Sequence, residues 1–201
     1  SEKLNINLQS CATTRIIEEI DRTSIVVMQY SKNNYNKMKV LPTIIFASMP
    51  CTGDTAWNTV NVHNENGKEK IQQHIALFDK LWTNFTKLVE HCSSPTTTVI
   101  IEWPRNCSYW KLPKVKAFLD SRDMSKINFD GCFFGLISKS THLPIKKPRT
   151  FATDNPEVLN LFQGCKCPGH SNRSQCEGKD TKLTENYTIH MCTRLHQAIS
   201  Q

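Results

Sequence analysis

Apolar residues in this sequence follow two patterns. Short runs that are rich in β-branched residues, or that alternate with polar residues, are typical of strands. They predict strands at residues 4–10, 24–30, 41–50, 96–104, 129–138 and 148–154. Longer stretches with apolar residues three or four positions apart are typical of helices that pack on one face. They predict helices at residues 15–20, 68–91, 112–123, 155–162 and 185–199.

The order of these elements predicts the fold class. Nearly continuous apolar strands separated by helices are typical of a mostly parallel sheet that is covered on both faces. We therefore predict an α/β fold, a three-layer sandwich, with one domain at residues 1–162. A Cys/His-rich loop at 163–183 and a C-terminal helix at 184–201, packed on the same domain, complete the expected organisation.

Composition narrows the class of protein. The chain has 201 residues, with 25 Lys and Arg against 18 Asp and Glu, and 38% of its residues are hydrophobic. This balance is too apolar for a disordered chain, and no apolar run approaches the roughly 20 residues that a membrane-spanning helix needs. The formal charge of +7 favours an acidic partner such as DNA or RNA, and no membrane partner is expected.

Nine cysteines are many for an intracellular chain. Their odd number and the length of the chain argue against a disulfide scaffold, which is normally short and has an even count. A secreted, disulfide-bonded glycoprotein stays open as an alternative, because four Asn-x-Ser/Thr sequons are present at Asn84, Asn106, Asn172 and Asn186. Residues 1–10 lack the apolar core of a signal peptide, so we expect an intracellular protein, cytoplasmic or nuclear.

Reactive side chains follow two consecutive predicted strands. Cys51 comes directly after the strand at 41–50, and Glu102 lies near the end of the strand at 96–104. In such α/β sheets, ligands bind at the carboxyl ends of the strands. We therefore predict that Cys51 and Glu102 share one cleft, next to Arg149 at the start of a later strand. The structural alternatives are a small buried thiol at Cys51 and a surface ion pair at Glu102.

Four short stretches stand out in order along the chain. They are SMPCTGDTAW (48–57), EWP (102–104), KKPRTF (146–151) and CKCPGH (165–170). Together they resemble DNA cytosine-5 methyltransferases, and more closely the methyltransferase-like domains in polyproteins of mobile elements or viruses. The resemblance implies a Rossmann-like methyltransferase fold, S-adenosylmethionine as the methyl donor, and cytosine in nucleic acid as the substrate.

The resemblance also implies a role for each matching residue. Cys51 is the nucleophile, because a thiolate must add to C6 of cytosine before C5 can attack a methyl group. Glu102 holds the ring at N3 and at the amino group, and can share a proton as charge builds there. Arg149 holds a phosphate or steadies the loop that carries Cys51. A base in a duplex must be flipped out to reach the thiol.

The expected cofactor-binding half departs from the family. The glycine-rich turn that normally follows the first strand corresponds to residues 10–14, which contain no glycine. Ser10, Cys11 and Asp54 are the positions left for the cofactor. One strand is also missing ahead of Cys51, so we expect the N-terminal cofactor-binding strands to be lost or to precede residue 1.

Two further functions therefore stay open. One is a catalytically inactive module of a mobile-element or viral polyprotein that binds nucleic acid or mediates interactions. The other is a cysteine hydrolase in which Cys51 pairs with His63 or His74.

A second group of reactive residues lies in the loop at 163–183. A loop rich in Gly, Pro and Ser can wrap a zinc ion when it offers four Cys or His ligands. The predicted ligands of this structural zinc are Cys165, Cys167, His170 and Cys176, with Cys192 or His190 as a substitute. The alternative is a flexible loop with free thiols.

The basic residues of this part of the chain predict a face that binds a nucleic-acid backbone. They are Lys146, Lys147, Arg149, Lys166, Arg173, Lys179 and Lys182.

Overall fold

The computed structural model describes residues 13–19, 24–31, 43–51 and 65–200, with side chains at 43–51 and 68–200. The predicted strand at 4–10 lies outside the described residues. So do four candidate site residues, Ser10, Cys11, Asp54 and His63.

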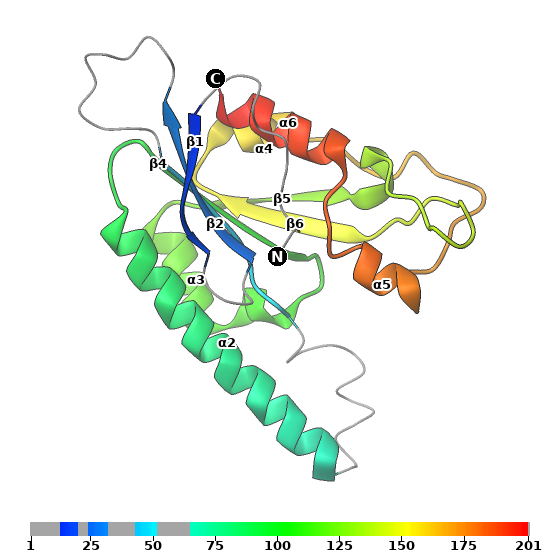
Figure 1. The fold of residues 1–201 in the computed structure, drawn as a ribbon, viewed down its shortest axis with the longest axis horizontal. Helices are drawn as coiled ribbons and strands as arrows, with labels where there is room; N and C mark the ends of the chain where they lie inside the picture. Colours follow the sequence, from blue (N-terminus) through cyan, green and yellow to red (C-terminus); the bar gives the residue numbers. More distant parts are fainter. Residues whose placement is uncertain (1–12, 20–23, 32–42, 52–64, 201) are drawn as a thin grey trace.

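A six-stranded sheet of order β1-β2-β3-β4-β6-β5 forms the centre of the fold (Figure 1). Its strands are β1 (Thr13–Glu19), β2 (Ser24–Ser31), β3 (Thr43–Ser48), β4 (Thr97–Pro104), β5 (Ser125–Asp130) and β6 (Pro148–Thr153). The four strands whose side chains are described, β3-β4-β6-β5, make a mixed sheet that carries every candidate site described below.

Strand direction differs from the prediction. The β3–β4 pair is parallel, whereas β1–β2, β2–β3, β4–β6 and β5–β6 are antiparallel. The prediction of a mostly parallel sheet is therefore wrong, because an apolar run shows that a strand is buried but not which way it runs. Since β5 and β4 are both antiparallel to β6, the strands β3, β4 and β5 point the same way. Their carboxyl ends lie beside the start of β6, along one row of strand ends. We call this row of strand ends the carboxyl edge.

Helices cover both faces of the sheet, so the α/β class is confirmed (Figure 1). The long α2 (Glu65–His91) and α3 (Pro113–Ser121) pack on one face, whereas α4 (Pro156–Phe162) and α6 (Ile189–Ile199) pack on the other. The short helices are η2 (Ser108–Lys111), η3 (Gly131–Phe134) and α5 (Lys179–Leu183). Within the described ranges, no helix combines the length and the apolar character that crossing a membrane requires.

Side-chain alternation along the central strands builds two cores. In β3, Ile45 and Ala47 join the cluster beneath α2 and α3, whereas Ile44 and Phe46 join the cluster beneath α4 and α6. A strand that is apolar at every position is therefore buried on both faces, as its sequence indicates. The predicted apolar stripe of the long helix is only partly buried, because Ile75 remains 44% exposed.

Two predicted elements are wrong. The segment predicted as a helix at 15–20 belongs to strand β1, which is paired with β2. The strand predicted at 129–138 ends at Asp130, and the chain then turns into η3. At Gly131 a Cβ would lie 2.8 Å from Cδ2 of Leu136, so any larger residue in this turn would have to displace the Leu136 side chain. The remaining predicted strands and helices within the described residues are confirmed, with small shifts at their ends.

Candidate functional site at the carboxyl edge

The loop that carries Cys51 is held from beneath by a tryptophan. The indole N–H of Trp103 donates to the carbonyl of Met49 at 2.9 Å, and both side chains are buried. Trp103 follows Glu102 on β4, so the same strand fixes the loop and presents the carboxyl group. The thiol of Cys51 is half-buried and packs against the core beneath α2 and α3.

Neighbouring groups make the thiol of Cys51 more acidic than usual. A hydrogen bond with the side chain of Cys107 is the largest cause that lowers the pKa of Cys51. Burial and the charge of Glu102 act in the opposite direction, and the charge of Lys147 lowers this pKa again. A lowered pKa increases the thiolate, which is the nucleophilic form of cysteine. The effect of Glu102 on Cys51 means that the two predicted residues are close enough to interact.

Glu102 is the centre of a buried network and is only 3% exposed. Its Oε1 accepts from Nη1 of Arg149 at 3.0 Å, in an ion pair whose two side chains are both buried. Its Oε2 accepts from the hydroxyls of Ser48 and Tyr187, each at 2.8 Å. These bonds use three of the roughly four acceptor positions of a carboxylate.

The residues around Glu102 respond to its charge. Burial would lower the pKa of Arg149, but Glu102 raises it above its ordinary value and keeps the guanidinium charged. Burial and Glu102 raise the pKa of Tyr187, so its phenol stays protonated and donates. The guanidinium of Arg149 also lies over the ring of Tyr187, 4.9 Å from its centroid, and Nη2 donates to the carbonyl of Thr184 at 2.5 Å.

Lys147 completes the charged part of the site. Burial, together with the charge of Arg149, lowers the pKa of Lys147 to about 8. Its ammonium group donates to the carbonyl and the hydroxyl of Thr184, and it interacts electrostatically with Cys51, Glu102 and Cys176. We refer to Cys51, Glu102, Lys147, Arg149 and Tyr187 as the Cys51–Glu102 site.

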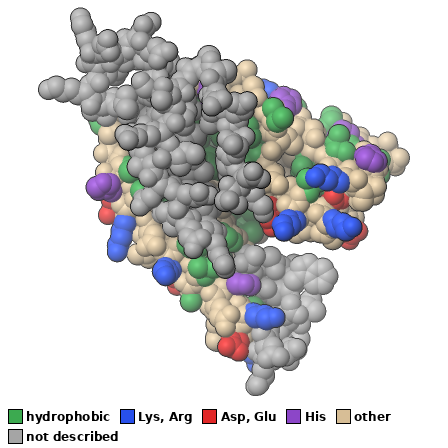
Figure 2. All heavy atoms as spheres, viewed as in Figure 1, with side chains coloured by type: hydrophobic (Ala, Val, Ile, Leu, Met, Phe, Trp, Pro, Cys, Tyr) green, Lys and Arg blue, Asp and Glu red, His purple; other side chains and the backbone are tan. Residues whose placement is uncertain are grey.

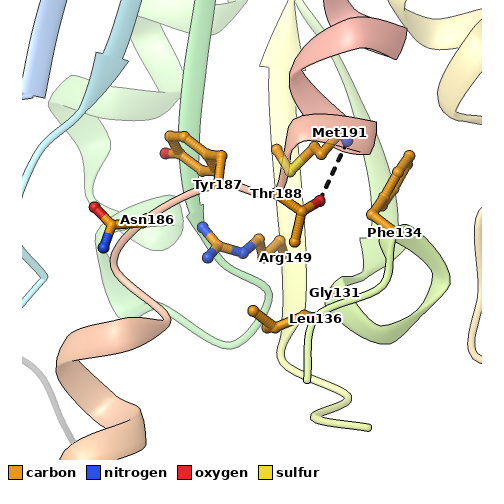
Figure 3. A pocket seen from close by; sticks show the side chains of 8 residues that line it. All are labelled: Gly131, Phe134, Leu136, Arg149, Asn186, Tyr187, Thr188 and Met191. Carbon is orange, nitrogen blue, oxygen red and sulfur yellow. Dashed lines mark hydrogen bonds between the residues drawn. The ribbon is translucent and has the colours of Figure 1, made fainter. Parts of the chain in front are cut away.

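A small pocket opens beside this site on the α6 face (Figure 3). Arg149 and Tyr187 line it together with Leu136, Phe134 and Met191. The two core clusters show that Cys51 packs towards the α2 face, whereas Tyr187 packs beneath α6. The Cys51–Glu102 site therefore spans the carboxyl edge from one face of the sheet to the other.

A second cluster lies close by, at the end of β5. Cys132 of η3, Cys167 and His170 place their ligand atoms within 4.8 Å of one another, so this group can hold a metal ion. The pKa of Cys132 is raised to about 11 by burial, and Cys167 adds to this effect. The pKa of Cys167 is lowered, first by the backbone N–H groups of Gly169 and His170.

The predicted zinc ligands are thus half right. Cys167 and His170 belong to the group, but Cys165 and Cys176 do not. Cys165 is buried in the core beneath α4, where its thiol contacts the carbonyl of Leu161 at 3.5 Å. The exposed Cys176 contacts the hydroxyl of Thr184 at 3.1 Å instead. All eight cysteines of the described ranges are free thiols.

The predicted basic face is smaller than expected. Arg149 is buried against Glu102, and Lys147 is turned inward to Thr184. Exposed Lys and Arg side chains do gather over the region of α5, but acidic side chains lie among them (Figure 2). The exposed basic residues of this region include Lys166, Arg173, Lys179 and Lys182.

Sequence reasoning missed several members of both groups. Cys107 and Cys132 receive no role in the sequence-based prediction, although their positions just after Pro104 and Asp130 are a signal that could place them at the carboxyl edge. Tyr187 carries no such signal, since it lies within the segment predicted as the C-terminal helix and, in the structure, just before α6. His74, the proposed partner of Cys51 in a hydrolase, forms no hydrogen bond with Cys51 among the interactions of the described residues.

Comparisons of the chain with family models, curated proteins and solved structures gave no match.

Proposed function

We propose that this chain is a methyltransferase-like domain, related to cytosine-5 methyltransferases, whose Cys51 adds to the cytosine ring in nucleic acid. One observation carries the proposal: Cys51 follows β3, Glu102 lies near the end of the neighbouring parallel strand β4, and the two groups interact electrostatically at the carboxyl edge. The lowered pKa of Cys51 supports its role as the nucleophile.

The addition step uses groups of this site alone. The thiolate of Cys51 forms a bond to C6 of cytosine, and the electron pair of the C5–C6 double bond moves to C5. In this proposal Glu102 carries a proton when the base binds and donates it to N3 while negative charge develops on the ring. Because Tyr187 and Ser48 occupy Oε2 of Glu102, one of these hydroxyls must give way to the base.

Methyl transfer requires a donor in addition to these residues. S-adenosylmethionine would supply the methyl group that C5 attacks, and its expected contacts, Ser10, Cys11 and Asp54, lie outside the described residues. The addition of the thiolate can be tested without this donor, because an enamine formed at C5 also takes up a proton from the solvent.

The test is deuterium exchange at C5 of cytosine in an oligonucleotide incubated with the protein in D₂O. Addition of Cys51 lets C5 take up a deuteron; loss of the original C5 proton and departure of the thiolate then restore the ring with deuterium bound to carbon. Mass spectrometry of the nucleosides, after back-exchange in H₂O, should show deuterium at C5. The exchange should disappear in Cys51→Ala and persist in Cys192→Ser, a matched variant of another half-buried thiol. Wild-type protein that binds the oligonucleotide without exchange would overturn the proposal.

A second candidate is a binding module without catalysis. The observation that favours it is that three side chains of the protein itself already bond to Glu102. In this case the Lys and Arg residues near α5 would contact phosphates, and affinity would fall steeply with salt.

Fluorescence anisotropy with a labelled oligonucleotide tests this candidate. Lys179→Glu combined with Lys182→Glu should weaken binding and reduce the salt dependence, because both side chains are exposed on α5. The matched control is Lys80→Glu with Lys87→Glu, which reverses two exposed charges on α2. Equal losses in both variants would contradict a binding face at α5.

A further inference from the structure

We propose that Cys132, Cys167 and His170 bind a zinc ion beside the carboxyl edge. This inference does not depend on the proposed function, because none of the three residues belongs to the Cys51–Glu102 site. Their ligand atoms already lie within 4.8 Å of one another, and they come from two separate segments, η3 and the loop that follows α4. A metal ion would therefore join parts of the chain that are far apart in sequence.

The backbone around Cys167 is arranged for a thiolate. The N–H groups of Gly169 and His170 donate to the sulfur of Cys167. This turn needs a positive φ at Gly169, which is 91° and which L residues rarely adopt. Hydrogen bonds of this kind stabilise the negative sulfur, which is the form that binds a metal.

Asp130 supports the group without joining it. Its Oδ2 accepts from the backbone N–H of Cys167 at 2.9 Å, and its Oδ1 pairs with Arg105 at 2.8 Å. Both oxygens are thus already bonded, and the carboxylate holds the first residue of the Cys167–His170 turn in place. Such outer partners orient the ligands of metal sites.

His170 has an unused ligand atom. Its Nε2 is buried and has no hydrogen-bond partner in the described part of the chain. A buried imidazole nitrogen without a partner is costly, and coordination of a metal ion would satisfy it.

The chemistry of the donors selects zinc. Two thiols and one imidazole suit a borderline-soft ion, whereas calcium and magnesium require oxygen ligands. Among the described residues no fourth Cys, His, Asp or Glu joins the group, so a water molecule would take the fourth position of a tetrahedral ion.

The ion would stabilise the segment at residues 163–178, which buries few side chains. Between residues 163 and 178, Cys165 is the one residue that is fully buried. The segment is held at a bridge from Ile145 to Ser174, and beyond it the buried Asp180 of α5 accepts from Ser138 at 2.5 Å. The N–H of Cys167 also donates to Asp130, and zinc at Cys167 and His170 would add an attachment to η3.

Elemental analysis of the full-length chain, purified after expression with zinc, tests the assignment. We expect one zinc per chain, lost in Cys132→Ser, Cys167→Ser and His170→Ala. The matched control is Cys176→Ser, because Cys176 is exposed and lies outside the group. Circular dichroism shows whether each variant keeps its helices and strands.

Cobalt provides a readout that needs no variant. Wild-type protein stripped of metal and loaded with Co²⁺ should show the sulfur-to-metal charge-transfer absorption and the intense visible bands of a tetrahedral thiolate site. Protein that binds neither metal overturns the proposal, as does loss of zinc in Cys176→Ser or its retention in Cys132→Ser. A disulfide between Cys132 and Cys167 in freshly purified protein, detected by mass spectrometry without reductant, would also overturn it.

Discussion

At the scale of single residues, Cys51 depends on two neighbours with different effects. Cys107 donates a hydrogen bond that stabilises the thiolate directly, whereas Lys147 acts through its charge. The charge of Lys147 itself fades as the pH passes its pKa of about 8. The pKa of Cys51 is therefore lowered by a constant contact and by a pH-dependent one.

The rate of alkylation of Cys51 as a function of pH should report both effects. The midpoint should lie below the ordinary thiol value of 9.0, since the pKa of Cys51 is lowered. Cys107→Ala should move this midpoint upward because the hydrogen bond is lost, and Lys147→Met should move it upward by less. Quantitative mass spectrometry of the alkylated peptides provides the measurement. Cys192, whose pKa is raised by burial, serves as the internal control, and an unchanged midpoint in Cys107→Ala would contradict the assigned cause.

At the scale of elements, local sequence signals succeed where the contacts are local. Asn155 and Pro156 predict the start of α4, and the side chain of Asn155 accepts from the N–H groups of Glu157 and Val158, at 2.9 and 3.1 Å. The segment at 15–20 has no such signal, and it pairs with the next strand along the chain, β2. Strand pairing overrides helical spacing in a short segment of this kind.

The N-cap of α4 allows a prediction of how much stability its loss should cost. Asn155→Ala should lower the free energy of unfolding by about 1 kcal/mol, because two backbone N–H groups lose their acceptor. Urea denaturation measures this loss. Asn160→Ala, an exposed change within the same helix, should have a much smaller effect. Equal losses in the two variants would mean that the cap is not the cause.

At the scale of the whole molecule, the sequence predicts the positions of Cys51 and Glu102 but not the network around them. Cys51 and Glu102 could be predicted because each lies just after or near the end of an apolar strand, and the rule for strand ends then brings them together. Tyr187 and the inward turn of Lys147 could not, since both depend on how the segment from α5 to α6 packs against β6. The metal group also required the structure, because Cys132 and Cys167 meet only after β5 ends early at Asp130.

The buried pair of Glu102 and Arg149 should therefore stabilise the whole fold. Arg149 joins β6 to β4 through Glu102 and to the C-terminal segment through Thr184. Arg149→Met should cost about 3–5 kcal/mol of unfolding free energy, because Glu102 would be left buried without its partner. Adding Glu102→Gln should restore part of that loss, as chemical denaturation of the single and double variants can show. A double variant that is less stable than Arg149→Met would contradict this account.

The position of β6 has a consequence for tolerance to insertions. Because β6 is hydrogen-bonded to β4 on one side and to β5 on the other, two ladders set where Arg149 lies. The connection from Gly135 to Lys147 contains buried residues such as Ser138, which bonds to Asp180, but its tip at Ser140 and Thr141 is exposed. A peptide epitope inserted after Thr141 would therefore lengthen the connection without changing the distance between the Arg149 guanidinium and the Glu102 carboxylate. This tip is thus a suitable place to label the protein.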